Sequence, residues 1–236
     1  MALPYFYVPT LPSANESLVL DEETSKHVTQ VLRMKVEEEL MLTDGSGVKG
    51  KAVITDDHRK RCTVNVLSVE REEEHRPRVT IAISLVKNTS RFEWFLEKAT
   101  EIGVHAIIPL LCDRTEKEKF RHDRLHQIIV SAMLQSQQCW LPLLHQPTEF
   151  QSLLQANEAP QTFIAHCLPE QKLSLAQEAK AVAADSIILI GPEGDFTPAE
   201  IEAALQKGYA PVSLGRTRLR TETAGIVAAT LLCNRD

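Results

Sequence analysis

Residues 186–208 read SIILIGPEGDFTPAEIEAALQKG and contain one complete strand–loop–helix unit. The run Ser186–Ile190 is apolar without alternation, which is typical of a parallel strand covered on both faces. Thr197–Glu200 reads as a helix start, with a capping box and a proline at the first helical position. Gly208 suits the end of that helix. A buried strand that leads directly into a capped helix predicts an α/β fold.

The same alternation extends through residues 76–236. Strands are expected at Val79–Val86, Ala106–Leu111, Phe163–His166 and Val212–Leu214. Helices are expected from Ser90, capped in a box with Glu93, to Gly103, and over Asp123–Gln137 and Thr221–Cys233. This order predicts a parallel sheet with helices on both faces.

Residues 1–75 read as a separate, small β-rich module that is compatible with a barrel. A helix is expected over Asp21–Leu32, with Val28, Val31 and Leu32 on its apolar face. The expected strands are Leu40–Leu42, Gly50–Thr55 and Cys62–Val69, with a turn at Asp44–Gly47. The highly charged run Glu70–Arg78 places the domain boundary near residue 75.

Composition excludes several classes of protein. The chain has 236 residues, 43% hydrophobic and 25% charged, which is an ordinary globular mix. No apolar run approaches the roughly 20 residues of a membrane span, and the N-terminus has no basic region typical of a signal peptide. Five widely spaced cysteines favour reduced, buried thiols in a cytosol over a disulfide framework.

The net charge of −6 argues at face value against nucleic acid, but the charge is uneven. Residues 76–236 hold 17 basic and 18 acidic side chains. Basic residues gather in two places. Over Arg114–Arg124 acidic residues interleave with them, so a solvated face explains this cluster equally well. Over Arg216–Arg220 no acidic residue interrupts the cluster. The second cluster is therefore the better candidate for an anion site.

Three loops follow predicted strands at the edge where ligands of open parallel sheets bind. They contain His166 and Cys167, then Gly191–Phe196, then Gly215–Arg220. The last two lead into helix N-termini, which favour anionic groups, although simple tight turns would look the same. Neither a dinucleotide-binding nor a P-loop glycine pattern occurs. His122 and His126 lie four residues apart, but no third metal ligand stands out, so no metal is expected.

Two motifs together resemble the RsmE family of ribosomal RNA small-subunit uracil-N3 methyltransferases, of the SPOUT superfamily. They are IGPEGDFT at 190–197 and LGRTRLRTETA at 214–224. Further similarity lies in VLRMK at 31–35, in Asp44–Gly47, and from Arg91 to Val104 with Pro109. The resemblance covers nearly the whole chain in the right order.

The resemblance implies a PUA-like β-barrel RNA-binding domain over residues 1–75 and a SPOUT α/β domain with a C-terminal trefoil knot over residues 76–236. It implies a cytoplasmic homodimer that uses S-adenosylmethionine to methylate N3 of one uridine in small-subunit (16S) ribosomal RNA, in the assembled subunit. The cofactor-binding residues carried over are Ala165, His166, Cys167, Ile190, Gly191, Pro192, Glu193, Gly194, Leu214, Gly215, Arg218, Leu219 and Arg220.

Uracil N3 carries a proton at neutral pH, so its methylation requires a base, a cation that stabilises the ring anion, or both. Arg220 is the first choice for the cation. Glu222 is a candidate base, although capping its helix is an equal alternative. The candidate RNA-binding cations are Arg33, Lys35, Lys87, Arg91, Lys117, Lys119, Arg121 and Arg124.

Several positions depart from the family pattern. They are Glu37, Asn88 and Asp195, where glycine is common, and Leu134 and Gln138, where glutamate and arginine are often seen. Two alternatives remain open: the same enzyme class acting on another RNA, and a ribosome-assembly module that binds RNA without cofactor.

Overall fold

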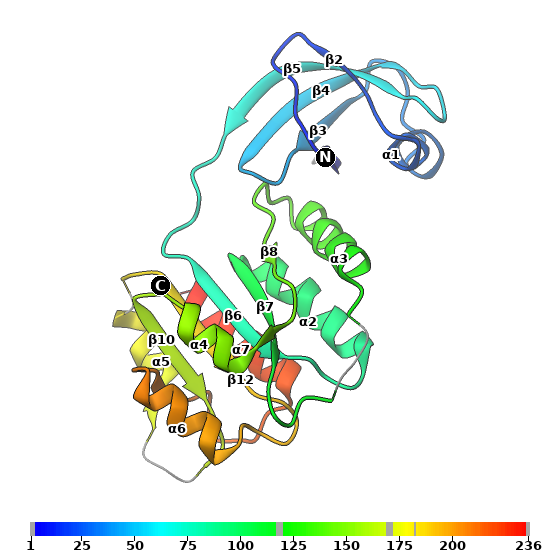
Figure 1. The fold of residues 1–236 in the computed structure, drawn as a ribbon. Coiled ribbons are helices and arrows are strands. Elements are labelled where there is room, and N and C mark those ends of the chain that lie inside the picture. Colours follow the sequence, from blue (N-terminus) through cyan, green and yellow to red (C-terminus); the bar gives the residue numbers. More distant parts are fainter. Residues whose placement is uncertain (1–2, 117–119, 169–171, 182, 235–236) are drawn as a thin grey trace. The chain divides into compact units, whose positions relative to one another are not determined.

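The computed structural model describes residues 3–116, 120–168, 172–181 and 183–234. The chain divides into two compact units. The smaller unit comprises Met1–Glu74 together with Met133–Leu141, and the larger comprises His75–Ala132 and Pro142–Asp236. Figure 1 shows the fold of each unit.

The smaller unit is built on one five-stranded sheet in the order β1-β3-β4-β5-β2. Its strands are β1 (Tyr5–Tyr7), β2 (Ser17–Val19), β3 (Glu39–Thr43), β4 (Val48–Asp56) and β5 (Thr63–Arg71). β1 pairs with β3 in parallel, and the other pairs are antiparallel. The three predicted strands are confirmed. Within the described residues the edge strands β1 and β2 do not pair, so the sheet is open where a closed barrel was expected.

The predicted helix is present but ends differently from the expectation. Helix α1 (Glu22–Lys26) is capped by the Asp21 side chain and continues into a π-helical turn at His27–Val31. There Leu32 N–H donates to the His27 carbonyl at 2.9 Å, five residues back, which widens the turn. The predicted apolar face is therefore wrong beyond Val28, which is fully buried, because Val31 and Leu32 are 68% and 44% exposed.

A segment distant in sequence completes the smaller unit. Residues 133–141 belong to it, and Gly47 N–H donates to the Cys139 carbonyl at 2.9 Å. Gly47 has φ +85°, and a Cβ at this position would overlap the Trp140 ring. Glycine is thus required here both by backbone conformation and by the indole packed against it. The turn was predicted from sequence, whereas this contact was not.

The larger unit contains a parallel sheet in the order β11-β13-β10-β12-β6-β7-β8, with β9 also on β7. Its strands are β6 (Val79–Ser84), β7 (Ala106–Leu111), β8 (Leu143–Leu144), β9 (Thr148–Glu149), β10 (Gln161–Ala165), β11 (Leu173–Ser174), β12 (Ser186–Ile190) and β13 (Ala210–Ser213). Every pair in it is parallel. The predicted strands and their parallel direction are confirmed.

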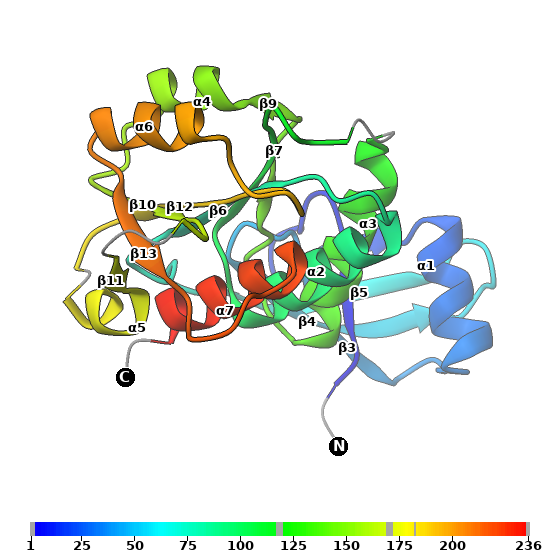
Figure 2. The same ribbon diagram turned by 90° about the horizontal axis from the view of Figure 1, so that it is seen from below.

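Helices cover both faces of this sheet, as predicted. The helices that follow β6 are α2 (Thr89–Ile102), α3 (His122–Gln135, whose last three residues belong to the smaller unit), α4 (Phe150–Ala156), α5 (Leu175–Glu178), α6 (Pro198–Gln206) and α7 (Thr221–Cys233), with a 3-10 turn at Ala179–Ala181. Figure 2 shows α4 and α6 on one face, and α2, α5 and α7 on the other. Among the helices that the structure describes, none has the length and apolar character to cross a membrane.

The helix starts differ in how well sequence anticipated them. At α6 the capping box between Thr197 and Glu200 is present as predicted. At α2 the N-cap is Asn88 and not Ser90, because the Asn88 side chain accepts the Ser90 N–H two residues on. Glu93, expected in the capping box, instead binds Arg124 at 2.8 Å.

Gly225 allows α7 to pack closely in the core of the larger unit. A Cβ built on Gly225 would lie 2.6 Å from the Phe95 ring on α2 and 2.8 Å from Ile83 on β6. Phe95 and Ile83 are fully buried. This close packing fixes the position of α7, whose N-terminal residues reach the candidate site.

Candidate active site

A cavity of about 840 Å³ opens at the carboxyl ends of β10, β12 and β13. Its volume is within the range of small-molecule sites, roughly 300–1,000 Å³. The three loops singled out from the sequence meet here. Every residue predicted to bind cofactor lines the cavity except Gly194, whose carbonyl accepts from the Arg114 guanidinium at 2.7 Å.

The loop after β12 is held by a turn and by the start of α7. Asp195 N–H donates to the Pro192 carbonyl at 2.9 Å, which closes a turn. The Thr221 hydroxyl donates to the Gly191 carbonyl at 3.0 Å. A Cβ at Gly191 would lie 3.0 Å from the buried Phe196 ring, so this position has no room for a larger side chain.

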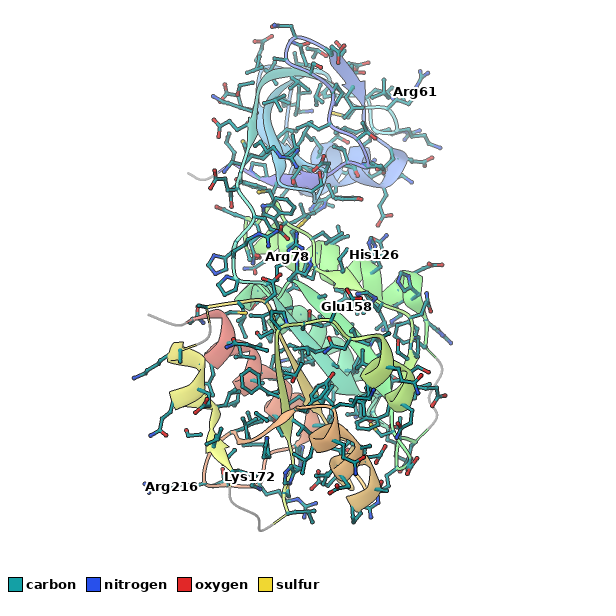
Figure 3. The ribbon with its side chains drawn as sticks, turned by 60° about the vertical axis from the view of Figure 1, so that its left-hand side comes forward. Arg61, Arg78, His126, Glu158, Lys172 and Arg216 are labelled. Atoms are coloured by element: carbon teal, nitrogen blue, oxygen red, sulfur yellow. The ribbon has the colours of Figure 1, made fainter. Side chains whose placement is uncertain are left out.

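The cavity also takes in residues that were not predicted to bind a cofactor. Arg91, which was predicted from the sequence to bind RNA, lines the cavity. Lys172, Asp195 and Arg216 line it as well. Figure 3 shows Lys172 and Arg216 at the same end of the larger unit. Lys172 stands in no motif, so only the fold identifies it.

Glu222 is placed differently from a base that faces a substrate. It is 6% exposed, does not line the cavity, and its Oε2 has no hydrogen-bond partner within the described chain. Its Oε1 lies 3.7 Å from Arg91 Nε, while Arg91 Nη1 lies 3.4 Å from Glu193 Oε1. Arg91 therefore compensates one buried and one exposed carboxylate.

The cations of the loop after β13 differ from Arg91. Arg218 Nη2 donates to the Glu193 carbonyl at 3.5 Å. Arg216 and Arg220 are exposed, and the described residues offer their side chains no ion pair. Arg220 is also the N-cap residue of α7, whose first N–H groups favour negative charge. The cavity therefore has a positive rim with backbone donors beside it.

Three of the other predicted RNA-binding cations have acidic partners within the described residues. Within the larger unit, Lys87 pairs with Glu116 at 3.2 Å, Arg124 pairs with Glu93, and Arg121 is exposed. Within the smaller unit, Lys35 pairs with Asp57 at 3.2 Å and Arg33 is exposed. Lys117 and Lys119 lie outside the described residues.

The histidine pair and the thiols have simple environments. His122 and His126 stack at 6.1 Å between ring centroids, and no group of three metal-ligating side chains occurs in the described part of the chain. Burial raises the pKa of the Cys62 and Cys139 thiols to about 11, and that of Cys112 further. The expectation of a buried thiol is wrong for Cys167, which is exposed because it follows the end of β10 and lines the cavity.

Two family models match the chain. The one described as an RNA methyltransferase domain matches residues 72–233, and the one described as an RNA methyltransferase PUA domain matches residues 20–67. The first match contains the whole cavity.

Individual relatives agree with these matches. Ribosomal RNA small subunit methyltransferase E of Synechocystis is 33% identical, over 86% of this chain and 68% of that protein. The Mycobacterium bovis protein of the same name is 31% identical, over 97% and 90%. The solved structure of the Neisseria gonorrhoeae protein of that name, bound to S-adenosyl methionine, has a TM-score of 0.87 and 27% identity, over 97% and 95%.

Proposed function

The chain belongs to the RsmE family of ribosomal RNA small-subunit methyltransferases, and from this we propose that it methylates N3 of a uridine in small-subunit (16S) ribosomal RNA with S-adenosylmethionine. The observation that carries the proposal is the cavity formed by the three predicted loops. A binding module without cofactor would not need such a cavity.

The residues present fit S-adenosylmethionine, which has a carboxylate, an ammonium, a sulfonium and an adenine. The positive rim of the cavity matches the carboxylate, and the exposed Glu193 carboxylate matches the cationic groups. Gly191 and Gly215 allow the backbone to approach a flat ring closely. When bound, the cofactor supplies an electrophilic methyl group. We assign residues 76–236 to a SPOUT domain whose chain forms a trefoil knot around these loops.

In the proposed mechanism the chain orients uracil N3 and stabilises the charge that develops on the ring. Orientation alone supplies much of the rate of a displacement. Arg220 has no carboxylate partner in the described chain, so its charge is available to the O2 or O4 of the deprotonated ring. Glu222 remains a predicted base, but its burial beside Arg91 favours a positioning role.

The proposed partner is small-subunit RNA in the assembled particle, bound by a homodimer in the cytoplasm. The PUA match at residues 20–67 supports an RNA-binding role for residues 1–75. The exposed cations Arg33 in the smaller unit and Arg121 in the larger would contact phosphates, because no ion pair with a described residue engages them. The target uridine must leave its stack for N3 to reach the methyl group.

Calorimetric titration with S-adenosylmethionine tests the cofactor site. We expect the wild type to bind and Gly191→Val to lose binding, because its side chain would collide with Phe196. Gly50→Val is the matched control, since a Cβ at Gly50 is equally crowded, at 3.0 Å, but lies on β4 of the smaller unit. This control should bind normally. A wild type that binds no cofactor even with RNA present would favour the binding module.

Methylation assays then identify the substrate. We expect transfer of labelled methyl to uracil N3 in small-subunit RNA, and faster transfer with the assembled small subunit than with naked RNA. Faster methylation of transfer RNA would replace the proposed substrate and leave the cofactor site intact.

A further inference from the structure

Asp195 joins two of the loops that line the cavity. Its Oδ2 accepts the Cys167 N–H at 2.8 Å, and its Oδ1 accepts the Phe196 N–H at 2.9 Å. Cys167 follows β10, whereas Asp195 follows β12. One carboxylate thus ties the first cofactor loop to the second.

The backbone at Asp195 adopts a conformation that favours glycine. Its φ is +64°, in the left-handed region, which few residues other than glycine occupy and where aspartate and asparagine are enriched. A glycine, common at this position in the family pattern, would adopt that φ without strain but would bring no carboxylate. This chain therefore has a strained residue where its side chain bridges two loops.

Lys172 holds the same loop through its carbonyls. Its Nζ donates to the His166 carbonyl at 2.7 Å and to the Leu168 carbonyl at 2.7 Å. The loop at residues 166–168 is therefore bound by a cation at two carbonyls and by an anion at the N–H between them. Hydrogen bonds to charged groups are stronger than neutral ones, so both contacts restrain the loop.

We propose that Asp195 and Lys172 form a clamp that holds residues 166–168 in the shape that receives S-adenosylmethionine. The inference rests on the proposed function. Both are positioning residues, and they act through the loop backbone. Ordering the loop before the cofactor arrives removes that ordering cost from binding.

Amide hydrogen exchange of the cofactor-free protein tests the clamp directly. Asp195→Ala removes the acceptor of the Cys167 N–H, and we expect the exchange of this amide to accelerate about tenfold or more. Asp195→Asn keeps an acceptor oxygen and tolerates positive φ, so its protection should stay within about threefold of wild type. Asp195→Gly relieves the strain but removes the acceptor, and should resemble Asp195→Ala.

Cofactor titration and kinetics complete the test. For Asp195→Ala and for Lys172→Met we expect the dissociation constant for S-adenosylmethionine to rise about tenfold, with kcat at saturating cofactor within about twofold. The double variant should lose less than the product of the two effects, because both side chains restrain one loop. Glu37→Gly is the matched control: Glu37 also has positive φ, +73°, but lies in the smaller unit, and both readouts should be unchanged.

Three results would overturn the inference. Unchanged Cys167 exchange in Asp195→Ala would show that no clamp exists. Lost cofactor affinity in Asp195→Asn with the amide still protected would mean that the Asp195 charge contacts the cofactor directly. The third result combines two measurements: the wild type binds no cofactor, yet the Cys167 amide still exchanges faster in Asp195→Ala. The clamp would then exist without its proposed role, and the proposed function would be refuted separately.

Discussion

The two halves of the larger sheet both end in loops rich in cations, but in the described chain these cations differ in whether a carboxylate pairs with them. After β13, Arg216 and Arg220 line the cavity without a carboxylate partner in the described chain. After β6 and β7, Lys87 and Arg124 are paired with Glu116 and Glu93. Both clusters look basic in sequence.

The difference lies in what the fold places opposite each cation. Acidic residues from neighbouring loops and helices reach the second cluster, whereas the first faces a cavity that glycine loops keep open. A paired cation must give up its partner before it binds a phosphate, and this offsets part of the gain. The comparison therefore predicts unequal effects for similar substitutions in the two halves.

The largest effect is expected at Arg220. Arg220→Ala should lower kcat for methylation by about 10²–10³-fold, the usual cost of removing a group that stabilises a developing anion. Cofactor affinity should change only a few-fold, so the loss should appear in kcat. Arg59→Ala, at an exposed arginine of the smaller unit to which no role is assigned, is the control and should retain kcat. Equal loss in both variants would erase the comparison.

The next largest effect is expected at Gly225, where α7 packs against Phe95 of α2 and Ile83 of β6. Gly225→Ala inserts a methyl group between Phe95 and Ile83, and overpacking of this kind costs about 1–3 kcal/mol. Urea unfolding should show this loss of free energy of unfolding. Thr230→Ala, at an exposed position of the same helix, should stay within about 0.5 kcal/mol. If Gly225→Ala has the same free energy of unfolding as the wild type, α7 shifts easily, and its packing does not fix the residues that line the cavity.

Sequence predicted the regular elements well because their determinants are local. The Thr197–Glu200 capping box and the apolar strand Ser186–Ile190 were both found where expected. The π-helical turn at His27–Val31 was missed, since nothing local distinguishes it from an α-helix. The packing of Trp140 on Gly47 was missed because it joins residues 93 positions apart, which no periodicity records.

The candidate site divides in the same way. Glycine loops at strand ends and helix N-termini can be read from sequence, and these gave the residues that line the cavity. Asp195 was visible only as a departure from a pattern, because its role depends on the Cys167 N–H of another loop. Lys172 binds carbonyls, which have no sequence signature. The acidic partner of Arg124 is 31 residues away, so its neutralisation was also hidden.

A double substitution at the cavity rim should have a moderate effect on RNA. Arg216→Ala with Arg218→Ala should weaken RNA binding roughly tenfold at moderate salt, and should lower the slope of log affinity against log salt by about 1–2, as expected for lost phosphate contacts. Filter binding or fluorescence anisotropy across a salt series measures both. An unchanged slope would indicate that these arginines do not contact phosphates.

The smallest effect is expected at Arg124, and it tests the comparison most directly. Arg124→Ala should change RNA affinity by less than about twofold, because Glu93 already holds this guanidinium through two hydrogen bonds, at 2.8 and 3.1 Å. Glu93→Gln should then raise affinity and steepen the salt dependence, because it frees the cation for phosphate. If Arg124→Ala instead loses as much as the rim double variant, the RNA must displace Glu93. Ion pairing in the free protein would then not determine which half of the sheet binds RNA.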